Sequence, residues 1–362
     1  MTKETFKVIG VMSGTSLDGI DLIYVQFNFD EKWTYTIYTT ETVSYTQYWE
    51  NTLKHLVSNS KQELKDIDDG YTVYLAEVIN SFIKKHHIET VDAICSHGHT
   101  ALHQPQSGMT YQIGNLPKMS KLLQHTVVCD FRLQDVEFGG QGAPLVPIGD
   151  KLLFSDYDFC LNLGGFANIS TEIDDTRIAY DICPVNIVLN HYVKPLGFNY
   201  DDKGQIAKSG KLHIELLNRL NDLDFYSKSH PKSLGLEWVK QLIFPIIDAY
   251  DLPIETILRT FTEHVAVQIS KEINTKHNAK VLVSGGGAYN KFLLDLIVSK
   301  TKNSIELPSK EINEFKEALI FGLLGVLKLK GAVNCLKSVT GAKKNHSSGR
   351  IYYPKNYYKI NI

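Results

Sequence analysis

Three glycine-rich segments carry the residue types that bind phosphate. The first, GVMSGTSLDG at 10–19, contains three hydroxyl residues, Ser13, Thr15 and Ser16. Glycine lets the backbone approach an anion closely, and hydroxyl groups add hydrogen-bond donors. A Walker loop is excluded because no Gly-Lys-Ser/Thr follows, and a Rossmann fingerprint is excluded because a strand, not a helix, comes next. A plain tight turn remains the alternative for this segment taken alone.

The other two glycine segments repeat this chemistry further along the chain. The first of them, at 162–170, places its glycines between two short strands; the other, at 283–290, ends a strand and opens a helix. The glycines are Gly164 and Gly165 in the first, and Gly285, Gly286 and Gly287 in the second. Backbone N–H groups at a helix N-terminus suit a phosphate or ribose. Three such loops in this order favour a nucleoside triphosphate as the ligand.

Strands and helices alternate around these loops. Strands rich in β-branched and aromatic residues are predicted at 6–12, 20–29, 33–40, 91–96, 126–129, 159–163, 167–172 and 281–284. Helices are predicted at 46–59, 64–87, 186–192, 211–221, 237–249, 254–277, 290–300 and 314–330. This alternation indicates the α/β class, and 362 residues favour two domains. Strand, glycine turn and strand occur in both halves, so we expect an internal duplication.

Composition excludes several classes of partner. With 38 Lys and Arg against 40 Asp and Glu, the chain has no basic field to collect nucleic acid or anionic lipid. The longest apolar run, 318–327, is about half the length needed to span a bilayer, and the N-terminus does not resemble a secretory signal. None of the five cysteines stands at C-x-x-C spacing, which fits reduced thiols. We therefore expect a cytoplasmic protein that binds neither nucleic acid nor membranes.

Seven segments together resemble one family of sugar kinases. They are the first glycine loop, SHGHT at 96–100, DFR at 130–132, GGQGAPLVP at 139–147, NLGG at 162–165, SGGG at 284–287 and VTGA at 339–342. The glycine loops look like the phosphate-1, phosphate-2 and adenosine segments of the actin, hexokinase and Hsp70 type of ATPase. Within that superfamily, the match is to anhydro-N-acetylmuramic acid kinase and covers nearly the whole chain.

The resemblance implies a two-lobed, actin-like ATPase fold of the ribonuclease H-like type, with the active site in the interlobe cleft. The N-terminal lobe is expected at 1–130, completed by 331–362, and the C-terminal lobe at 131–330. Such kinases use ATP and Mg²⁺. They open the 1,6-anhydro bridge of 1,6-anhydro-N-acetylmuramic acid with water and phosphorylate O6, giving N-acetylmuramic acid 6-phosphate in peptidoglycan recycling. A homodimer is compatible with this resemblance.

The resemblance also implies roles for particular residues. Water is a poor nucleophile at an anomeric carbon, so a carboxylate must take its proton, and Asp181 is the family-like base. Asp181 follows an apolar stretch and precedes Pro184, which predicts a loop beyond a strand end; a capping or turn aspartate is the alternative. Asp18 and Asp181 are the candidate Mg²⁺ ligands. The nucleotide contacts implied are Gly14, Thr15, Ser16, Leu17, Asp18, Gly19, Ile20 and Asp21, with Gly164, Gly165, Gly285, Gly286 and Gly287.

Sugar contacts are implied at residues matching the substrate-side motifs. They are His97, Thr100, Asp130, Arg132 and Glu317, of which Arg132 is suited to pair the lactyl carboxylate. A solvated helix face is the alternative for Glu317. A zinc site at His97, His99 and His103 is disfavoured because no fourth ligand has suitable spacing, so hydrogen-bonding roles are expected there.

One segment departs from the family pattern. Thr-Gly-Pro-Gly-Asn is expected after the catalytic aspartate, whereas this chain has Ile-Cys-Pro-Val-Asn at 182–186. Val185 in place of glycine disfavours positive φ and adds bulk close to the reacting centre. Because Asp181, Pro184 and Asn186 are kept, we expect an active variant; a catalytically silent relative that binds sugar or nucleotide as a sensor is the alternative. An actin-like filament or chaperone ATPase lacks support from these motifs.

Overall fold

The computed structural model describes residues 4–14 and 17–354, and it divides into two compact units. Unit 1 comprises residues 1–153 and 315–362, and unit 2 comprises residues 154–314. The lobe boundaries expected at 130/131 and 330/331 both fall inside unit 1. The reason is packing: Gly149 approaches the Ile320 side chain, and Lys316 forms an ion pair of 2.7 Å with Asp150. Residues 131–153 and 315–330 therefore belong with the N-terminal sheet.

Unit 1 is built on a six-stranded sheet of order β13-β7-β4-β1-β2-β3. The strands β1 (Glu4–Ser13), β2 (Ile20–Asp30) and β3 (Lys32–Val43) form an antiparallel meander. The strands β4 (Ala93–Ser96) and β7 (Val127–Cys129) add parallel to β1, and β13 (Arg350–Tyr352) closes the edge antiparallel to β7. The predicted meander and the two following strands are confirmed.

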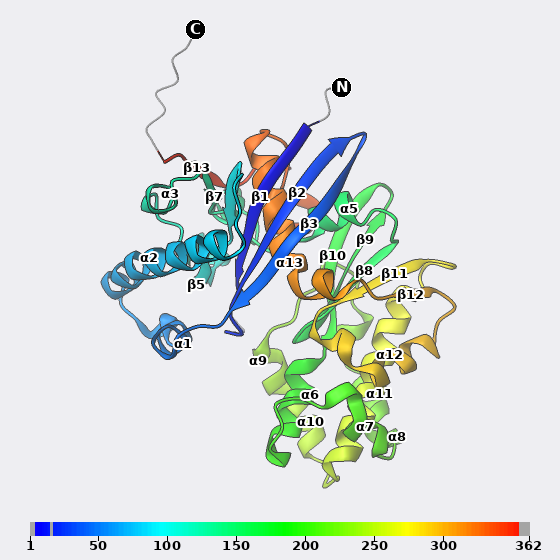
Figure 1. Ribbon diagram of the computed structural model, residues 1–362. Coiled ribbons are helices and arrows are strands. Elements are labelled where there is room, and N and C mark those ends of the chain that lie inside the picture. The colour runs from blue at the N-terminus through cyan, green and yellow to red at the C-terminus, as the bar shows by residue number, and fades with distance from the viewer. Residues whose placement is uncertain (1–3, 15–16, 355–362) are drawn as a thin grey trace. The chain divides into compact units, whose positions relative to one another are not determined.

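Helices cover both faces of this sheet, which explains why β1 is apolar at successive positions. On one face, α2 (Lys61–Lys85) packs against Ile9 and Val11, and a capping box of Ser60 and Glu63 starts this helix. On the other face lies α13 (Lys310–Leu329), as Figure 1 shows. A side chain at Gly10 would run into the Ala318 carbonyl of α13, so only glycine permits this close approach.

Smaller elements complete unit 1. A two-stranded hairpin, β5 (His99–Gln104) and β6 (Met109–Ile113), was not predicted from the sequence. The helices of unit 1 besides α2 and α13 are short. They are α1 (Gln47–Lys54), which is followed by the turn Leu56–Ser58, and α3 (Lys118–Leu123), α4 (Leu133–Glu137), α5 (Pro147–Leu153) and α14 (Lys337–Thr340).

Unit 2 repeats the topology of unit 1 in a five-stranded sheet of order β10-β9-β8-β11-β12. The strands β8 (Phe159–Leu163), β9 (Phe166–Ile173) and β10 (Thr176–Pro184) form the antiparallel meander. The strands β11 (Lys280–Ser284) and β12 (Ser304–Glu306) then add parallel to β8. The expected duplication is thus present as three antiparallel strands followed by two parallel ones in each unit. The α/β class is confirmed.

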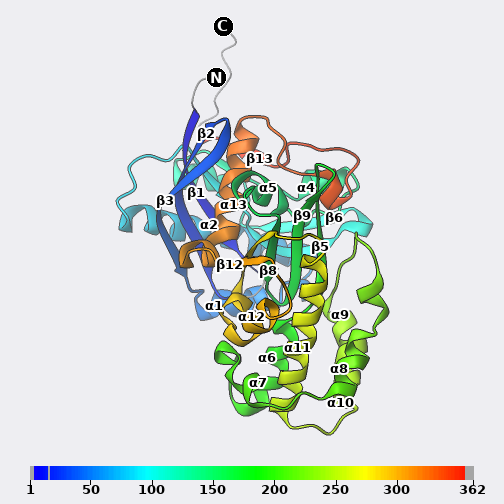
Figure 2. The ribbon, with the colours of Figure 1, turned by 90° about the vertical axis from the view of Figure 1, so that its right-hand side faces the viewer.

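Helices of unit 2 gather around α11 (Ile254–Ile273), which lies next to α6 (Asn186–Val193), α7 (Gln205–Ser209), α8 (Ile214–Asn221) and α12 (Lys291–Val298) (Figure 2). The helix predicted at 237–249 is a continuous run of α9 (Leu236–Trp238), a π-helical turn Val239–Ile243 and α10 (Phe244–Asp248). The helix predicted at 254–277 ends earlier, at Ile273.

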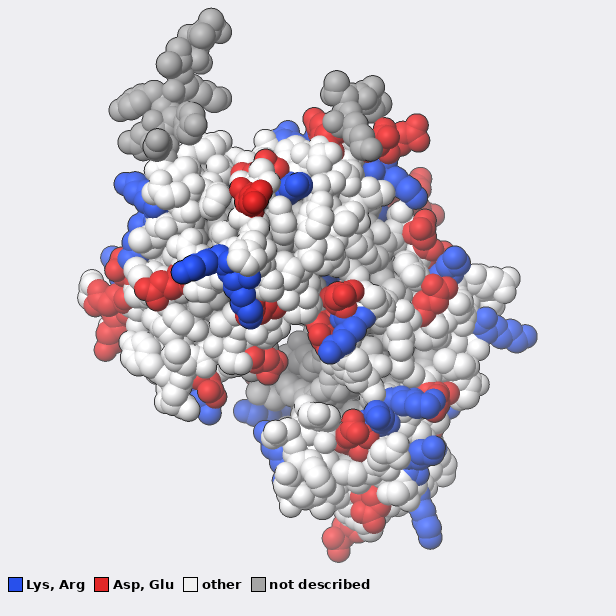
Figure 3. All heavy atoms as spheres, viewed as in Figure 1, with Lys and Arg blue, Asp and Glu red and all other residues white. Residues whose placement is uncertain are grey.

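The distribution of charged side chains and the state of the cysteines agree with what the composition predicts. On the face that Figure 3 shows, basic and acidic side chains are interspersed over the surface. All five cysteines lie among the described residues, and each is buried and outside any disulfide. Within the described residues, none of the helices combines the length and the apolar character needed to cross a membrane.

Candidate active site

The first glycine loop joins β1 to β2 in unit 1, but its hydroxyl residues are not equivalent. The Ser13 hydroxyl is buried and lies 2.6 Å from the Tyr45 hydroxyl, 2.7 Å from the Tyr71 hydroxyl and 2.9 Å from Nδ1 of His99. Ser13, expected to donate to phosphate, is therefore occupied by a network inside the protein. Thr15 and Ser16 lie outside the described residues.

Of the remaining residues expected to contact a nucleotide, Gly14, Leu17, Asp18 and Asp21 lie at or near the surface, whereas Gly19 is buried. The Leu17 amide donates to the Gly14 carbonyl, and Asp18 is exposed. Asp21 accepts a hydrogen bond of 2.6 Å from the Thr42 hydroxyl, which orients its carboxylate. Ile20 differs, because its side chain is fully buried in the core and only its backbone can contact a ligand.

A pocket of about 240 Å³ in unit 1 brings the first glycine loop together with one expected sugar residue. Leu17 comes from the loop, and His99, Thr100 and Ala101 come from β5. The remaining lining residues, Leu53, Lys54, Leu56 and Val57, belong to α1 and the turn after it. Sequence reasoning missed these four, since they belong to none of the recognised motifs.

Arg132 is the centre of a second group in unit 1. Its Nε donates to Nε2 of His97 at 2.8 Å, and its Nη1 donates to the Gly142 carbonyl at 2.7 Å. A guanidinium can only donate, so Nε2 of His97 must be unprotonated and Nδ1 carries the hydrogen, which it donates to the Gly98 carbonyl at 2.8 Å. Burial and the positive charge of Arg132 both lower the pKa of His97. His97 is thus a neutral acceptor that holds the guanidinium in place.

Glu317 of α13 provides the largest compensating charge for this partly buried guanidinium, ahead of Cys335 and Asp135. Loss of surrounding water raises the pKa of Glu317 and the nearby Asp21 carboxylate adds to the rise, whereas Arg132 and Lys316 lower it. Glu317 is nevertheless exposed on α13, as the alternative of a solvated helix face predicts, so a ligand can reach the carboxylate. The structure therefore brings together three of the expected sugar residues, His97, Arg132 and Glu317.

Asp130 joins this group indirectly. The Asn115 amide donates to Oδ1 of Asp130 at 3.1 Å and to the His97 carbonyl at 3.3 Å, so it ties Asp130 to the strand end that carries His97. Burial raises the pKa of Asp130 to about 6, although the Asn115 amide and the Arg350 guanidinium, 3.9 Å away, lower it. Asp130 can therefore exchange a proton close to neutral pH.

Asp181 lies within β10 of unit 2, which corrects the expectation of a loop beyond a strand end. Pairing of β10 with β9 continues to Pro184, with a bulge after Asp181. Proline is tolerated here because β10 is the edge strand of its sheet. Across the three strands of the meander, Asp181 stands opposite Asn168, and Asn168 stands opposite Asn162. Directly opposite residues share a face of the sheet, so these three form one polar row.

Among the described residues, only one oxygen of the Asp181 carboxylate accepts a hydrogen bond. Oδ2 accepts a hydrogen bond of 2.8 Å from the Leu234 amide, and the Asp181 amide donates to the Lys232 carbonyl at 3.1 Å. Within the described part of the chain, nothing else donates to this carboxylate. Burial raises the pKa of Asp181, and the Leu234 hydrogen bond lowers it. The arrangement leaves Oδ1 available as a base with a strengthened affinity for protons.

The glycine loops of unit 2 pack against one another beside this row. The Val185 amide donates to the Gly165 carbonyl at 2.8 Å, and the Asn186 amide donates to the Gly164 carbonyl at 3.3 Å. A side chain at Gly285, where φ is +89°, would lie 2.5 Å from Oδ1 of Asn162. A side chain at Gly287 would likewise press on Leu163. The phosphate-2 turn, the start of α6 and the loop at 285–287 thus form one continuous surface.

The departure at 182–186 leaves this surface unblocked. Val185 has φ of −131°, so the position does not need glycine, and its side chain is fully buried in the core of unit 2 with Ile182 and Cys183. The expected bulk at the reacting centre is therefore wrong, because the valine side chain points into the core.

The two candidate Mg²⁺ ligands are of the right chemical kind. Asp18 is exposed, and Asp181 has one carboxylate oxygen without a hydrogen-bond donor among the described residues. Mg²⁺ is usually held by one or two carboxylates, with waters and phosphate oxygens completing the octahedron. These residues fit that requirement.

Comparison with known families identifies this set of motifs. The sequence model of the anhydro-N-acetylmuramic acid kinase family matches residues 6–354. The chain belongs to this family. Curated proteins named anhydro-N-acetylmuramic acid kinase, from Pseudomonas syringae pv. tomato and Pasteurella multocida, are each 32% identical to it; the alignments cover 96% and 97% of this chain and 99% and 98% of the relatives. Membership of a kinase family implies the use of ATP.

Solved structures with a similar backbone have much lower sequence identity. The activator of 2-hydroxyisocaproyl-CoA dehydratase from Clostridium difficile, with bound ADPNP, is 13% identical at a TM-score of 0.43, covering 90% of this chain and 96% of that one. A ROK family glucokinase from Streptomyces griseus, in complex with glucose and AMPPNP, is 12% identical at a TM-score of 0.39, covering 88% and 99%.

Proposed function

We propose that this chain uses ATP to open and phosphorylate 1,6-anhydro-N-acetylmuramic acid, giving N-acetylmuramic acid 6-phosphate for peptidoglycan recycling in the cytoplasm. The family match over residues 6–354 supports the substrate class. The hydrolytic step is proposed from the hydrogen bonding of Asp181. Oδ2 of its carboxylate accepts a hydrogen bond, and Oδ1 has no donor among the described residues.

The chemistry assigned to Asp181 is general-base catalysis. Water attacks the anomeric carbon C1, its oxygen forms the new bond to C1, and its proton passes to Oδ1 of Asp181. The bond between C1 and O6 breaks, and O6 gains negative charge. O6 then attacks the γ-phosphorus of ATP, the bond to the β-phosphate oxygen breaks, and ADP leaves. Because bond cleavage itself charges O6, this transfer depends mainly on positioning and charge neutralisation.

Arg132 is assigned to the lactyl carboxylate of the sugar. Its planar guanidinium can form a bidentate pair with a carboxylate, and the hydrogen bonds to His97 and Gly142 fix the plane beforehand. Pre-organisation of this kind lowers the entropy lost when the sugar binds. Glu317 compensates the charge of the guanidinium, which is only partly buried and can therefore be reached by a ligand.

Bound Mg²⁺ would neutralise charge on the transferring phosphoryl group, and Asp18 and Asp181 are each a candidate to hold it, with waters and phosphate oxygens as the other ligands. A nearby cation lowers the pKa of a carboxylate, so the metal and base roles of Asp181 oppose each other. Comparing Mg²⁺ dependence in Asp18→Asn and Asp181→Asn variants therefore separates the two roles.

The segment at 182–186 supports an active enzyme over a silent sensor. Its changed side chains, Ile182, Cys183 and Val185, lie in the core of unit 2, while Asp181 keeps its hydrogen bond to Leu234. The three changed side chains therefore lie in the interior of unit 2 and not on its surface.

The test is a labelling experiment in water enriched in ¹⁸O, with ATP, Mg²⁺ and 1,6-anhydro-N-acetylmuramic acid. We expect a 6-phosphorylated sugar with one ¹⁸O, at a rate reduced about 10²- to 10⁴-fold in Asp181→Asn. The matched control is Asp175→Asn, an exposed carboxylate on the turn of the same hairpin. A wild-type chain that binds both ligands without forming product would refute the kinase proposal, and an unimpaired Asp181→Asn variant would refute the assignment of the base.

A further inference from the structure

Three potential metal ligands meet in the interior of unit 1, and none of them has a role in the proposed reaction. Asp135 comes from α4, whereas Cys335 and His346 come from the C-terminal segment. Sγ of Cys335 lies 3.0 Å from Oδ1 of Asp135, and Nε2 of His346 lies 3.7 Å from the same oxygen. All three ligand atoms lie within 4.8 Å of one another, and all three residues are buried.

The imidazole of His346 points to a missing partner in this cluster. Its Nδ1 lies 3.0 Å from the Lys344 carbonyl and must therefore carry the hydrogen that this bond requires. In the neutral ring, Nε2 then presents a lone pair toward Asp135 and Cys335. Nε2 is buried and has no hydrogen-bond partner in the part of the chain that the structure describes, and His346 is only 6% exposed. An unpaired buried polar atom is costly and calls for an occupant.

We propose that Asp135, Cys335 and His346 bind a divalent transition-metal ion, with zinc as the preferred metal. One thiolate sulfur, one imidazole nitrogen and one carboxylate oxygen are ligands that Zn²⁺ accepts in tetrahedral sites. Zinc bond lengths of about 2.0–2.3 Å place tetrahedral ligands about 3.4–3.6 Å apart. Two of the three pairs lie near that spacing, sulfur and oxygen at 3.0 Å and nitrogen and oxygen at 3.7 Å, so shifts of about half an ångström or less suffice for them. A water molecule completes the coordination.

The charges and protons balance at such a site. Cys335 now donates its thiol hydrogen to Oδ1 of Asp135, and on metal binding this proton is released to solvent while sulfur bonds to the metal. Zn²⁺ with one thiolate, one carboxylate and a neutral imidazole carries no net charge, as a buried site requires. Because the thiol must lose its proton before sulfur can bind the metal, metal affinity should increase with pH.

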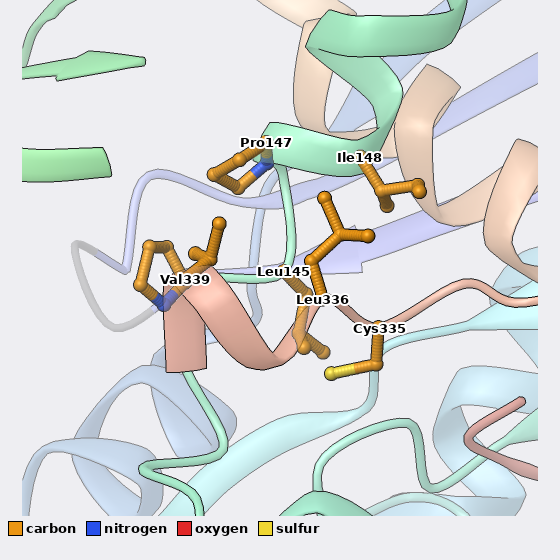
Figure 4. Close-up of a pocket in the computed structure, with 7 residues that line it drawn as sticks. Leu145, Pro147, Ile148, Cys335, Leu336 and Val339 are labelled. Atoms are coloured by element: carbon orange, nitrogen blue, oxygen red, sulfur yellow. The ribbon is translucent and has the colours of Figure 1, made fainter. Parts of the chain in front are cut away.

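The surroundings of the cluster resemble the outer shell of a metal site. The Nδ1 hydrogen bond to the Lys344 carbonyl fixes the orientation of the imidazole, as outer-shell carbonyls do for metal-binding histidines. On the sulfur side, Cys335 also lines a small pocket between the segments 144–148 and 335–339 (Figure 4). Leu145, Ile148, Leu336 and Val339 line it as well, so apolar side chains cover one side of the cluster.

A metal here would brace the loop that holds Arg132. Oδ2 of Asp135 accepts a hydrogen bond of 2.7 Å from the Gly142 amide, and the Gly142 carbonyl accepts the Arg132 bond. The Thr340 hydroxyl also donates to Asp135, at 2.7 Å, and ties in α14. The metal would thus join α4, the loop at 139–142 and the C-terminal segment. This is a structural role that does not depend on the proposed reaction.

The test measures metal in the purified full chain, without substrate. After dialysis against metal-free buffer, we expect about one zinc per chain by elemental analysis. Replacement of zinc by Co²⁺ should produce a thiolate-to-cobalt charge-transfer band and tetrahedral d–d bands. Both the zinc and the bands should be lost in Cys335→Ser, which retains a donor to Asp135, and strongly reduced in His346→Gln. Cys160→Ala, at a buried cysteine of unit 2, is the control and should retain both.

A melting experiment completes the test. A chelator should lower the melting temperature of the wild type but leave that of Cys335→Ser unchanged. The competing explanation is a protonated His346 paired with Asp135 and no metal at all. It predicts folded wild-type protein with no bound metal, no cobalt bands and no response to chelator, and this result would overturn the proposal. Equal metal binding by the wild type and Cys335→Ser would overturn it as well.

Discussion

Replacing Gly285 by alanine should destabilise unit 2 and disturb the expected nucleotide surface. The backbone there has φ of +89° and ψ of +173°, a region that only glycine occupies readily, and another residue costs about 1–3 kcal/mol. The new methyl would also lie 2.5 Å from Oδ1 of Asn162 and 3.0 Å from the Leu163 carbonyl carbon and oxygen. Overpacking of this kind adds about 1–3 kcal/mol. The free energy of unfolding should therefore fall by about 2–6 kcal/mol.

Thermal denaturation and ATP titration measure this effect. For a unit of this size, a loss of that magnitude corresponds to a drop in melting temperature on the order of 10 °C. Because Asn162 must move, ATP affinity should fall as well. Gly165→Ala is the matched control in the neighbouring loop: its φ is not positive, and the nearest atom to a new methyl is Cβ of Ile187 at 3.8 Å. It should change stability by no more than about 0.5 kcal/mol.

The reasoning about close packing would be refuted if Gly285→Ala melted with the wild type and bound ATP equally well. A large loss in Gly165→Ala would refute it too, because that position has room for a methyl group. A stability loss in Gly285→Ala with unchanged ATP affinity would retain the packing argument but remove this loop from the nucleotide site.

Two further predictions concern unit 1. Arg132→Lys keeps the positive charge but cannot donate to His97 and Gly142 at once, so the KM for the sugar should rise about 10- to 100-fold while the KM for ATP stays constant in steady-state kinetics. Asp130→Asn tests how ionisation of Asp130 affects stability. The pKa of Asp130 is about 6 in the folded protein against an ordinary value of 3.8. Ionisation of this carboxyl therefore opposes folding as pH rises from about 4 to 6. The variant should be more stable than the wild type by up to about 3 kcal/mol at pH 8 and equal to it below pH 4, in chemical denaturation at both pH values. Asparagine accepts the φ of +58° at this position, so a loss of stability at pH 8 would contradict the assigned pKa.

Local sequence patterns determined the elements that carry the motifs. Both meanders, with their glycine turns, follow from β-branched and aromatic runs interrupted by glycine, and α2 and α11 follow from helical spacing of apolar residues. These signals are local, since each depends on residues that are only a few positions apart in the sequence. The same locality explains why the hairpin of β5 and β6 was missed: its strands are short and alternate imperfectly, with a bulge between Thr100 and Leu102.

Only the tertiary structure decided how the functional side chains are used. Ser13 belongs to a phosphate-binding motif by sequence, yet three groups from distant segments occupy its hydroxyl. Asp181 looks like a loop residue because Pro184 follows, yet the edge position of β10 accommodates the proline and leaves the carboxylate in register with Asn168 and Asn162. Such outcomes depend on strand register and on which face of a sheet is covered, and neither is encoded by nearby residues.

The segment at 182–186 and the Asp135 cluster show most clearly the difference between what local sequence predicts and what long-range packing decides. By sequence, Val185 is a bulky replacement beside the catalytic residue, but the chain turns its side chain into the core, so its effect is on packing. Cys335 and His346 lie about two hundred residues from Asp135 along the chain, and no local spacing connects them. Residue types set which groups could bind protons, phosphate or metal, whereas long-range packing, which minimises unpaired buried polar atoms, set which groups meet.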